Sequence, residues 1–463
     1  MGCLLYLIAN IPQRNELFDA DYIIGLSTLT LVNVIVFFIT VRRYYPSWIS
    51  YDLFFILGFL IVHYQVPFLE AIGIPNAQPS KVWINKSVVN YAMWLSTVFL
   101  FLWMLGYYFF LSFRNKVFIP KKSAIGSKIV IKKSFNVLMV ISFIAFYTLV
   151  GSEFWKGNHQ GSDNWGAGAT YAHIFVRTFL FLSIIYIFYA NQNPLKRTKD
   201  YLNFYVNNKL VLNLSFFYCL GFLLIGDRGP IMQIALLYLA GYTLFVKRIS
   251  FIKIVGMIVL GSIILTIIGL GRTRDTSQRE GNIISTGLNN YENKEDINPT
   301  NELATQVRIL YRALDVVPSQ HPYLNGVSLV SNVVDVVPLS GMVTPVPKVY
   351  QNTTTFFTFL GQGPNPTYGE GSEIIADLYV NLGVIPTLIV ALLFGYFISF
   401  LTYKQQSNPN IKYIIIYFVL LNFALYINRA NFLMPLKVIV YMLVFNKIFI
   451  FTVKNNISNK IGL

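Results

Sequence analysis

Long apolar runs recur from one end of the chain to the other, separated by shorter polar segments. Many of these runs reach roughly 17–25 residues, the length that crosses the hydrocarbon core of a bilayer as a helix. A soluble protein could not bury so many uninterrupted apolar runs. The pattern therefore predicts an all-α polytopic integral membrane protein.

The runs predict about eleven membrane spans, and the first 20 residues leave the existence of a twelfth open. A single long polar segment, 272–373, interrupts them and predicts a large loop subdomain between membrane helices in 1–271 and in 374–463. The spans are expected near 22–41, 49–69, 89–111, 134–151, 171–190, 210–226, 230–246, 252–271, 374–402, 412–427 and 433–452.

The distribution of basic residues predicts the orientation. Of the 463 residues 55% are hydrophobic and 12% charged, and the net charge is +16. Lys and Arg gather in 112–133 and 191–209, whereas 70–88 and 152–170 contain few of them. Basic loops stay in the cytoplasm, so the C-terminus is expected there and the 272–373 loop on the extracytoplasmic side. This bias explains the positive charge without nucleic acid as a partner.

Within the loop, residues 301–317 predict a helix. Thr300 is positioned to cap it and Pro318 to end it. Arg308 and Arg312 are one turn apart on one face, where Asp315 offers a structural partner. Apolar residues recur at three- and four-residue spacing, at Leu303, Val307, Leu310, Leu314 and Val317.

Arg228 is the first candidate for anion binding. It lies in the turn Gly226-Asp-Arg-Gly-Pro230, directly before a predicted span. A helix N-terminus offers unpaired N–H groups and a partial positive charge, and an arginine strengthens that field. The alternative is an interfacial arginine paired with Asp227.

Further arginines lie on the same predicted side of the membrane. Clustered arginines suit an anionic ligand, because the guanidinium stays charged and matches phosphate geometry. Each also has a structural alternative, as a membrane anchor or as the solvated face of the loop helix. The candidates are Arg272, Arg274, Arg308, Arg312 and Arg429.

Three residues on that side are candidates for acid–base chemistry: Glu373, Glu370 and His321. Glu373 could instead favour a helix N-terminus through the helix dipole. The two cysteines and four histidines are scattered, which predicts neither a disulfide framework nor a metal site, and no cofactor is expected. Arg177 and Lys437 lie near span ends and are interpreted as membrane anchors.

These features resemble the bacterial O-antigen polysaccharide polymerases, the Wzy family. The resemblance covers most of the chain: many spans, the Gly226-Asp-Arg-Gly229 turn, a large late loop, and the segment Gly371–Gly383 entering a span. The Arg-x10-Gly motif of some members is not matched, since Arg312 and Gly326 are spaced differently. The resemblance implies a metal-independent membrane glycosyltransferase with a GT-C-like fold in the bacterial plasma membrane.

The resemblance also implies the reaction. Undecaprenyl diphosphate-linked oligosaccharide repeat units would be joined into O-antigen or a related surface polysaccharide of the lipopolysaccharide type, with undecaprenyl diphosphate as the leaving group. Its expected partners are these lipid-linked oligosaccharides, membrane lipids, a chain-length regulator and a flippase. Two alternatives stay open: a polysaccharide ligase that uses the same donor, and a flippase or transporter of the lipid-linked glycan. Charge that gathers at one surface rather than mid-membrane favours an enzyme over a transporter.

Overall fold

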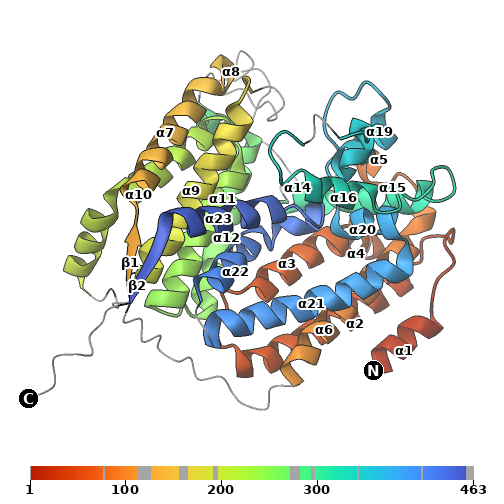
Figure 1. Ribbon diagram of the computed structural model, residues 1–463. Helices are drawn as coiled ribbons and strands as arrows, with labels where there is room; N and C mark the ends of the chain where they lie inside the picture. The colour runs from red at the N-terminus through yellow and green to blue at the C-terminus, as the bar shows by residue number, and fades with distance from the viewer. Residues whose placement is uncertain are drawn as a thin grey trace, which may run out of the picture.

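Helices dominate the fold of the chain. A computed structural model describes residues 2–76, 79–112, 127–155, 165–190, 195, 197–271, 282–292, 298–340, 344–407 and 410–454. Beside the helices, these residues include two short strands, Ser127–Ile131 (β1) and Ile450–Lys454 (β2), which pair antiparallel with Ser127 opposite Lys454. The strand β1 precedes α7, and β2 follows α23. Their pairing therefore joins two distant parts of the chain (Figure 1).

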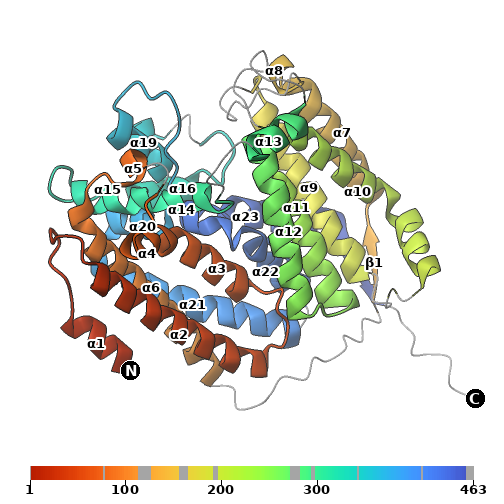
Figure 2. The ribbon, with the colours of Figure 1, turned by 180° about the vertical axis from the view of Figure 1, so that it is seen from behind.

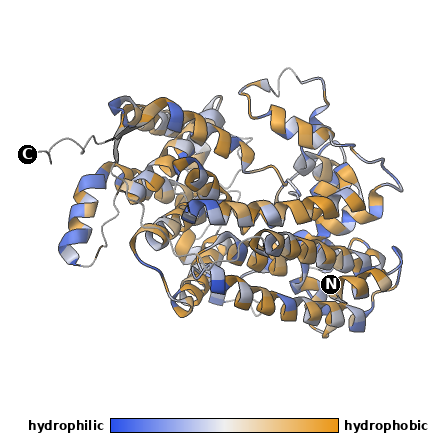
Figure 3. Cartoon of the chain, turned by 60° about the horizontal axis from the view of Figure 1, so that its bottom comes forward, coloured by the Kyte–Doolittle hydropathy of each residue, from blue (hydrophilic) through white to orange (hydrophobic). Residues whose placement is uncertain are grey.

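Six described helices are long and apolar enough to cross a membrane, and a bent pair of helices would make a seventh span. The chain is therefore a multi-pass membrane protein, and Figure 3 shows hydrophobic residues along the length of the long helices. The bent pair is α3 (Tyr51–His63) with α4 (Gln65–Ala71), at 45°. The six are α2 (Ala20–Tyr44), α6 (Val89–Ser112), α9 (Ala169–Ala190), α11 (Arg228–Gly241) with the π turn η3 (Tyr242–Val246), α12 (Phe251–Leu270) and α21 (Val384–Ser407).

The remaining predicted spans coincide with helices that are shorter or less uniformly apolar. The apolar helices α7 (Lys133–Leu149) and α22 (Ile411–Phe423) have 17 and 13 residues. Two others complete the set, α10 (Thr198–Leu224), which is kinked at Asn208, and α23 (Leu436–Phe449). A total of eleven spans stays a prediction.

The predicted continuous span over 374–402 is wrong. The chain forms a short helix, α20 (Ile374–Leu382), and then breaks at Gly383, whose φ of +79° lies in the left-handed region that favours glycine. Residues Ile374 to Asn381 are all buried inside the protein. An apolar run alone cannot distinguish such a buried helix from the start of a membrane span.

The helices α6 and α21 form the closest packed pair. A Cβ on Gly106 would lie 1.9 Å from the carbonyl oxygen of Leu392, and one on Gly395 would lie 1.9 Å from that of Trp103. Glycine therefore lets the two backbones touch, as small residues do between membrane helices. Phe110 further along α6 contacts Phe400, so the two helices run in the same direction.

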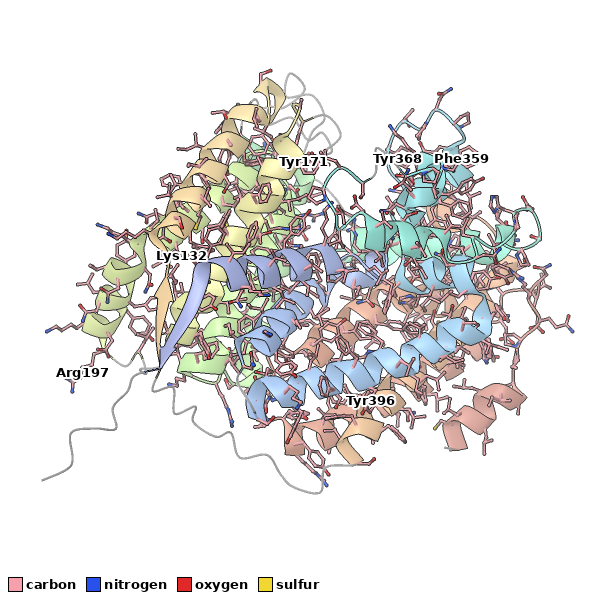
Figure 4. All side chains as sticks on the ribbon, in the orientation of Figure 1. Lys132, Tyr171, Arg197, Phe359, Tyr368 and Tyr396 are labelled. Carbon is pink, nitrogen blue, oxygen red and sulfur yellow. The ribbon has the colours of Figure 1, made fainter. Side chains whose placement is uncertain are left out.

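The segment between α12 and α21 folds against one end of the membrane helices (Figures 1 and 2). Figure 2 shows its first helix, α13, beside the end of α12, and Figure 4 shows Tyr368 far from Arg197, which precedes α10. Contacts hold this segment to the ends of α3 and α12 and to the starts of α6 and α11. Besides α20, its described helices are α13 (Ile283–Glu292), α14 (Asn301–Ala304), α15 (Arg308–Val316), α16 (Val327–Val334), α18 (Lys348–Gln351) and α19 (Thr353–Gln362).

The helix predicted at 301–317 forms as α14 and α15, joined by a 3-10 turn, η5 (Thr305–Val307). Two details of that prediction are wrong. The Thr300 side chain does not cap α14, because its hydroxyl donates to Gln65 Oε1 at 2.7 Å. Asp315 accepts from Asn85 Nδ2 at 2.7 Å, while Arg312 pairs with Glu370.

Candidate anion-binding site

Arg228 is the first residue of α11, as the turn predicted. Gly226 has a φ of +70°, and Asp227 caps the helix by accepting from the backbone N–H of Gly229 at 3.1 Å. This cap, rather than an ion pair with Arg228, is the role of Asp227. The Arg228 guanidinium instead donates to the carbonyl oxygen of Leu265 on α12, at 3.1 Å.

A glycine on α12 makes room for this guanidinium. A Cβ on Gly269 would lie 2.7 Å from Nη1 of Arg228 and 3.0 Å from its Cζ. The arginine therefore lies flat against bare backbone, at the end of one membrane helix and the start of another. This contact fixes where its remaining donors point.

Glu302, in the first turn of α14, joins Arg228 to Arg429. Its Oε2 pairs with Nη2 of Arg228, and its Oε1 lies 3.5 Å from Nη1 of Arg429. The side chains are partly exposed, at 20% for Arg228, 25% for Arg429 and 44% for Glu302. We call these three residues the open cluster. It lies at the seam between the loop segment and the membrane helices.

Arg429 comes from the break between the apolar helices α22 and α23. The helix α22 ends at Phe423, and a 3-10 turn, η6 (Tyr426–Arg429), follows before α23. Burial would lower the pKa of Arg429, but the Tyr426 phenol and the Glu302 carboxylate raise it above its ordinary value. Asn428 is fully buried and donates to the carbonyl oxygen of Phe55 on α3 at 3.1 Å. Non-helical backbone at the depth of a membrane must be buried in protein or line a cavity, and the buried Asn428 meets this requirement.

A second group of arginines surrounds Glu370. Its carboxylate lies 2.8 Å from Nη2 of Arg308 and 3.6 Å from Nη1 of Arg312. The side chains are only 8%, 13% and 3% exposed for Arg308, Arg312 and Glu370. Burial lowers the pKa of Arg308, although Glu370 opposes this effect. We call these three residues the closed cluster.

Backbone contacts tie the closed cluster into the fold. Gln306 Nε2 donates to the carbonyl oxygens of Glu370 and Ser372, at 2.9 and 3.2 Å. A Cβ on Gly361 would lie 2.2 Å from Nη1 of Arg312. The group thus fastens the glycine-rich stretch to α15.

The two clusters are neighbours. The charges of both Arg312 and Arg429 act on Arg308, so the four arginines of the two clusters lie in one region. Four arginines, Arg228, Arg308, Arg312 and Arg429, surround two bridging carboxylates. The region keeps an excess of positive charge even with Asp227, which also acts on Arg429, included.

Glu373 is a buried helix cap. Both of its carboxylate oxygens accept backbone N–H groups of α20, from Ile375 and Ala376 at 2.7 Å each. Oε1 also lies 2.7 Å from Nε2 of the buried His63. These contacts are those of a residue that stabilises a helix N-terminus, the alternative role that the sequence offered for Glu373. Its side chain has no exposed surface.

A second buried carboxylate, Asp377, lies one turn further along α20. It accepts from the Thr353 hydroxyl at 2.6 Å and from the backbone N–H of Phe432 at 2.8 Å. Burial raises its pKa to about 6 against the effect of these hydrogen bonds. It therefore connects α20 to α19 and to the segment that follows Arg429.

His321 lies apart from these carboxylates, on the loop after α15. Its Nδ1 is 2.7 Å from the carbonyl oxygen of Pro322, so Nδ1 carries the proton. Nε2 is 3.4 Å from the Tyr350 hydroxyl. In the neutral ring Nε2 is therefore the nitrogen that can accept a proton.

Not every predicted site residue can be placed. Arg272 and Arg274 lie outside the described residues. Within the described ranges, no group of three or more His, Cys, Asp or Glu side chains could hold a metal ion. Sequence reasoning missed the bridging role of Glu302, which it would treat only as a favourable first-turn acid, and it missed His63 and Gln306 entirely.

Comparison with known proteins adds no relative: no family model, curated protein or solved structure matches the chain. The class that the fold defines is a multi-pass membrane protein with an arginine-rich seam.

Proposed function

We propose that the protein is a membrane glycosyltransferase that polymerises undecaprenyl diphosphate-linked oligosaccharides into O-antigen or a related surface polysaccharide. The observation that carries this proposal is the open cluster, in which Arg228 and Arg429 converge from two membrane elements on one partly exposed carboxylate. Arginines held in place in this way suit a diphosphate. The seam is also where a lipid-borne diphosphate and a water-borne sugar would meet.

The proposed step breaks one bond and forms another. A hydroxyl oxygen of the incoming repeat unit attacks C1 of the sugar that holds the growing chain to its carrier. The C1–O bond to the diphosphate breaks, its electron pair leaves with undecaprenyl diphosphate, and the hydroxyl proton passes to a base. Negative charge grows on the leaving oxygen, and Arg228 and Arg429 would stabilise it without reorganisation.

The three predicted bases differ in their surroundings. Glu373 and Glu370 are both engaged in buried contacts that hold the loop segment together. His321 is partly exposed and presents Nε2 as an acceptor. His321 nevertheless follows the end of α15, whereas Glu302 precedes its start, so no described contact brings His321 to the open cluster and the base in this proposal stays unassigned.

Deletion of the gene followed by gel analysis of the surface polysaccharide tests the function. Loss of long chains with single repeats still attached to their anchor is the expected result. Full-length chains stranded on the carrier would indicate the ligase alternative, and glycan retained in the cytoplasm would indicate a flippase.

Arg228→Ala, expressed in the deletion strain, tests the site. It should insert normally and leave only single repeats. The matched control is Arg248→Ala, because Arg248 is exposed in the connection between η3 and α12 at the other end of the same helices. Normal polymer length from Arg228→Ala would refute the diphosphate role.

A further inference from the structure

Arg177 lies inside a membrane helix rather than at its end. It follows the first residue of α9, Ala169, by eight positions, which places it roughly 12 Å into a candidate span. Its Cζ is 5.7 Å from the ring centre of Phe423 on α22, and its polar neighbours include Tyr218 on α10 and His173 on α9. The anchoring interpretation is therefore wrong for Arg177, because these contacts direct the side chain between helices.

The guanidinium has no counter-ion in the described part of the chain. Arg177 forms neither an ion pair nor a hydrogen bond there, and its Nε is buried without a partner. One turn nearer the start of α9, His173 contacts Tyr218 at 2.8 Å, but neither group is an anion. An unpaired charge within a span is costly, and such residues usually mark a functional site.

The position of Arg177 connects it to the open cluster. Phe423 is the last residue of α22, and Arg429 follows six residues later in the break before α23. The helix α9 packs against α11, α22 and α23, and α11 begins with Arg228. Arg177 therefore lies on the membrane side of the same break that presents Arg429.

We propose that Arg177 is a phosphate-binding residue at the membrane side of the seam, and that its missing counter-ion is the phosphate of a bound lipid. This inference rests on the proposed function in naming the lipid as undecaprenyl diphosphate. Arg228 and Arg429 hold the diphosphate from the water side, and Arg177 contacts it from between α9 and α22. Arg177 lies within a candidate span and is partly exposed, so a headgroup carried on a lipid tail can reach it from the bilayer.

The test measures binding and stability together. Full-length wild type, Arg177→Met and Arg177→Lys are placed in phosphatidylcholine nanodiscs, and the Kd for undecaprenyl diphosphate is measured. Arg177→Met should weaken binding roughly ten- to hundred-fold, the effect of losing a charge-assisted hydrogen bond. Arg177→Lys should retain part of the affinity, and Arg248→Met should bind as wild type does.

Thermal unfolding without ligand separates binding from a structural role. Because Arg177 has no charge partner among the described residues, Arg177→Met removes an uncompensated charge and should unfold at the same temperature as wild type or higher. Lower stability of Arg177→Met would overturn the proposal in favour of a structural arginine. Unchanged affinity would also overturn it while leaving the proposed function intact.

A second lipid distinguishes the source of the phosphate. The same variants are titrated with phosphatidylglycerol in place of undecaprenyl diphosphate. An effect confined to phosphatidylglycerol would overturn the assignment to the carrier lipid. Wild type that binds neither lipid would refute both the proposed function and this inference.

Discussion

The open and closed clusters are built alike, since each brings two arginines to one carboxylate, but they differ in access. In the open cluster the Glu302 side chain is 44% exposed, whereas the Glu370 side chain in the closed cluster is 3% exposed. Burial lowers the pKa of Arg308. The pKa of Arg429 is raised, because the effects of Tyr426 and Glu302 outweigh that of burial. Two arginines and one glutamate thus form a buried fastening in one place and a partly exposed cluster in the other.

The difference teaches which arginines to expect in binding. In the closed cluster Arg308 and Arg312 pair with Glu370 and also donate to the carbonyl oxygens of Glu370 and Phe357, and all three side chains are nearly buried, so a ligand would have to displace these contacts to enter. In the open cluster an exposed carboxylate occupies the position that a diphosphate would take. A surface ion pair of this kind contributes little to stability and is readily exchanged.

The largest expected effect is on chain growth. Arg429→Ala should reduce polymer formation roughly 100-fold or more, because one preorganised donor to the leaving group is lost. Quantifying polymer per molecule of membrane-inserted protein measures this directly. Arg312→Ala should leave that ratio close to wild type, and a similar loss in both variants would erase the distinction between the clusters.

The two carboxylates should differ in their contribution to folding. Glu370→Gln leaves Arg308 and Arg312 buried without a charge partner and should cost about 3–5 kcal/mol. Glu302→Gln removes a partly exposed pair and should cost less than about 1 kcal/mol. Reversible unfolding in detergent measures both. Equal losses of unfolding free energy in the two variants would mean that the exposed fraction of each side chain does not determine how much its ion pairs stabilise the fold.

A smaller effect is expected at Gly269. Alanine there would push the guanidinium of Arg228 away from α12, since its Cβ would lie 2.7 Å from Nη1. Polymer formation should fall while insertion stays normal. Gly261→Ala on the same helix is the control, because its Cβ would meet nothing within 4 Å. Equal activity of the two variants would show that the position of Arg228 does not matter.

The smallest effect is expected for a glycine-to-alanine change beside the closed cluster, at Gly361. Gly361→Ala would displace Arg312, and the result should be a modest loss of thermal stability with activity per folded molecule retained. Gly369→Ala, in open space, serves as the comparison. A loss of specific activity in Gly361→Ala alone would place Arg312 in the reaction.

Much of the membrane architecture could be predicted from apolar runs, because their length alone identifies α2, α6, α9, α12 and α21. The break at Gly383 could not, since a buried short helix and a span begin with the same apolar residues. The turn at Arg228 indicated a helix N-terminus from local chemistry. Which carboxylate each arginine meets depends on contacts between distant segments, such as Glu302 with Arg429, and no local pattern encodes them.

The central claim is that the open cluster, and not the closed one, binds the lipid diphosphate. The most direct measurement is the Kd of purified protein for undecaprenyl diphosphate, determined for wild type, the double variant Arg228→Ala with Arg429→Ala, and Arg312→Ala. The double variant should lose binding, and Arg312→Ala should keep the wild-type Kd per folded molecule. Retained affinity in the double variant with lost affinity in Arg312→Ala would contradict the claim.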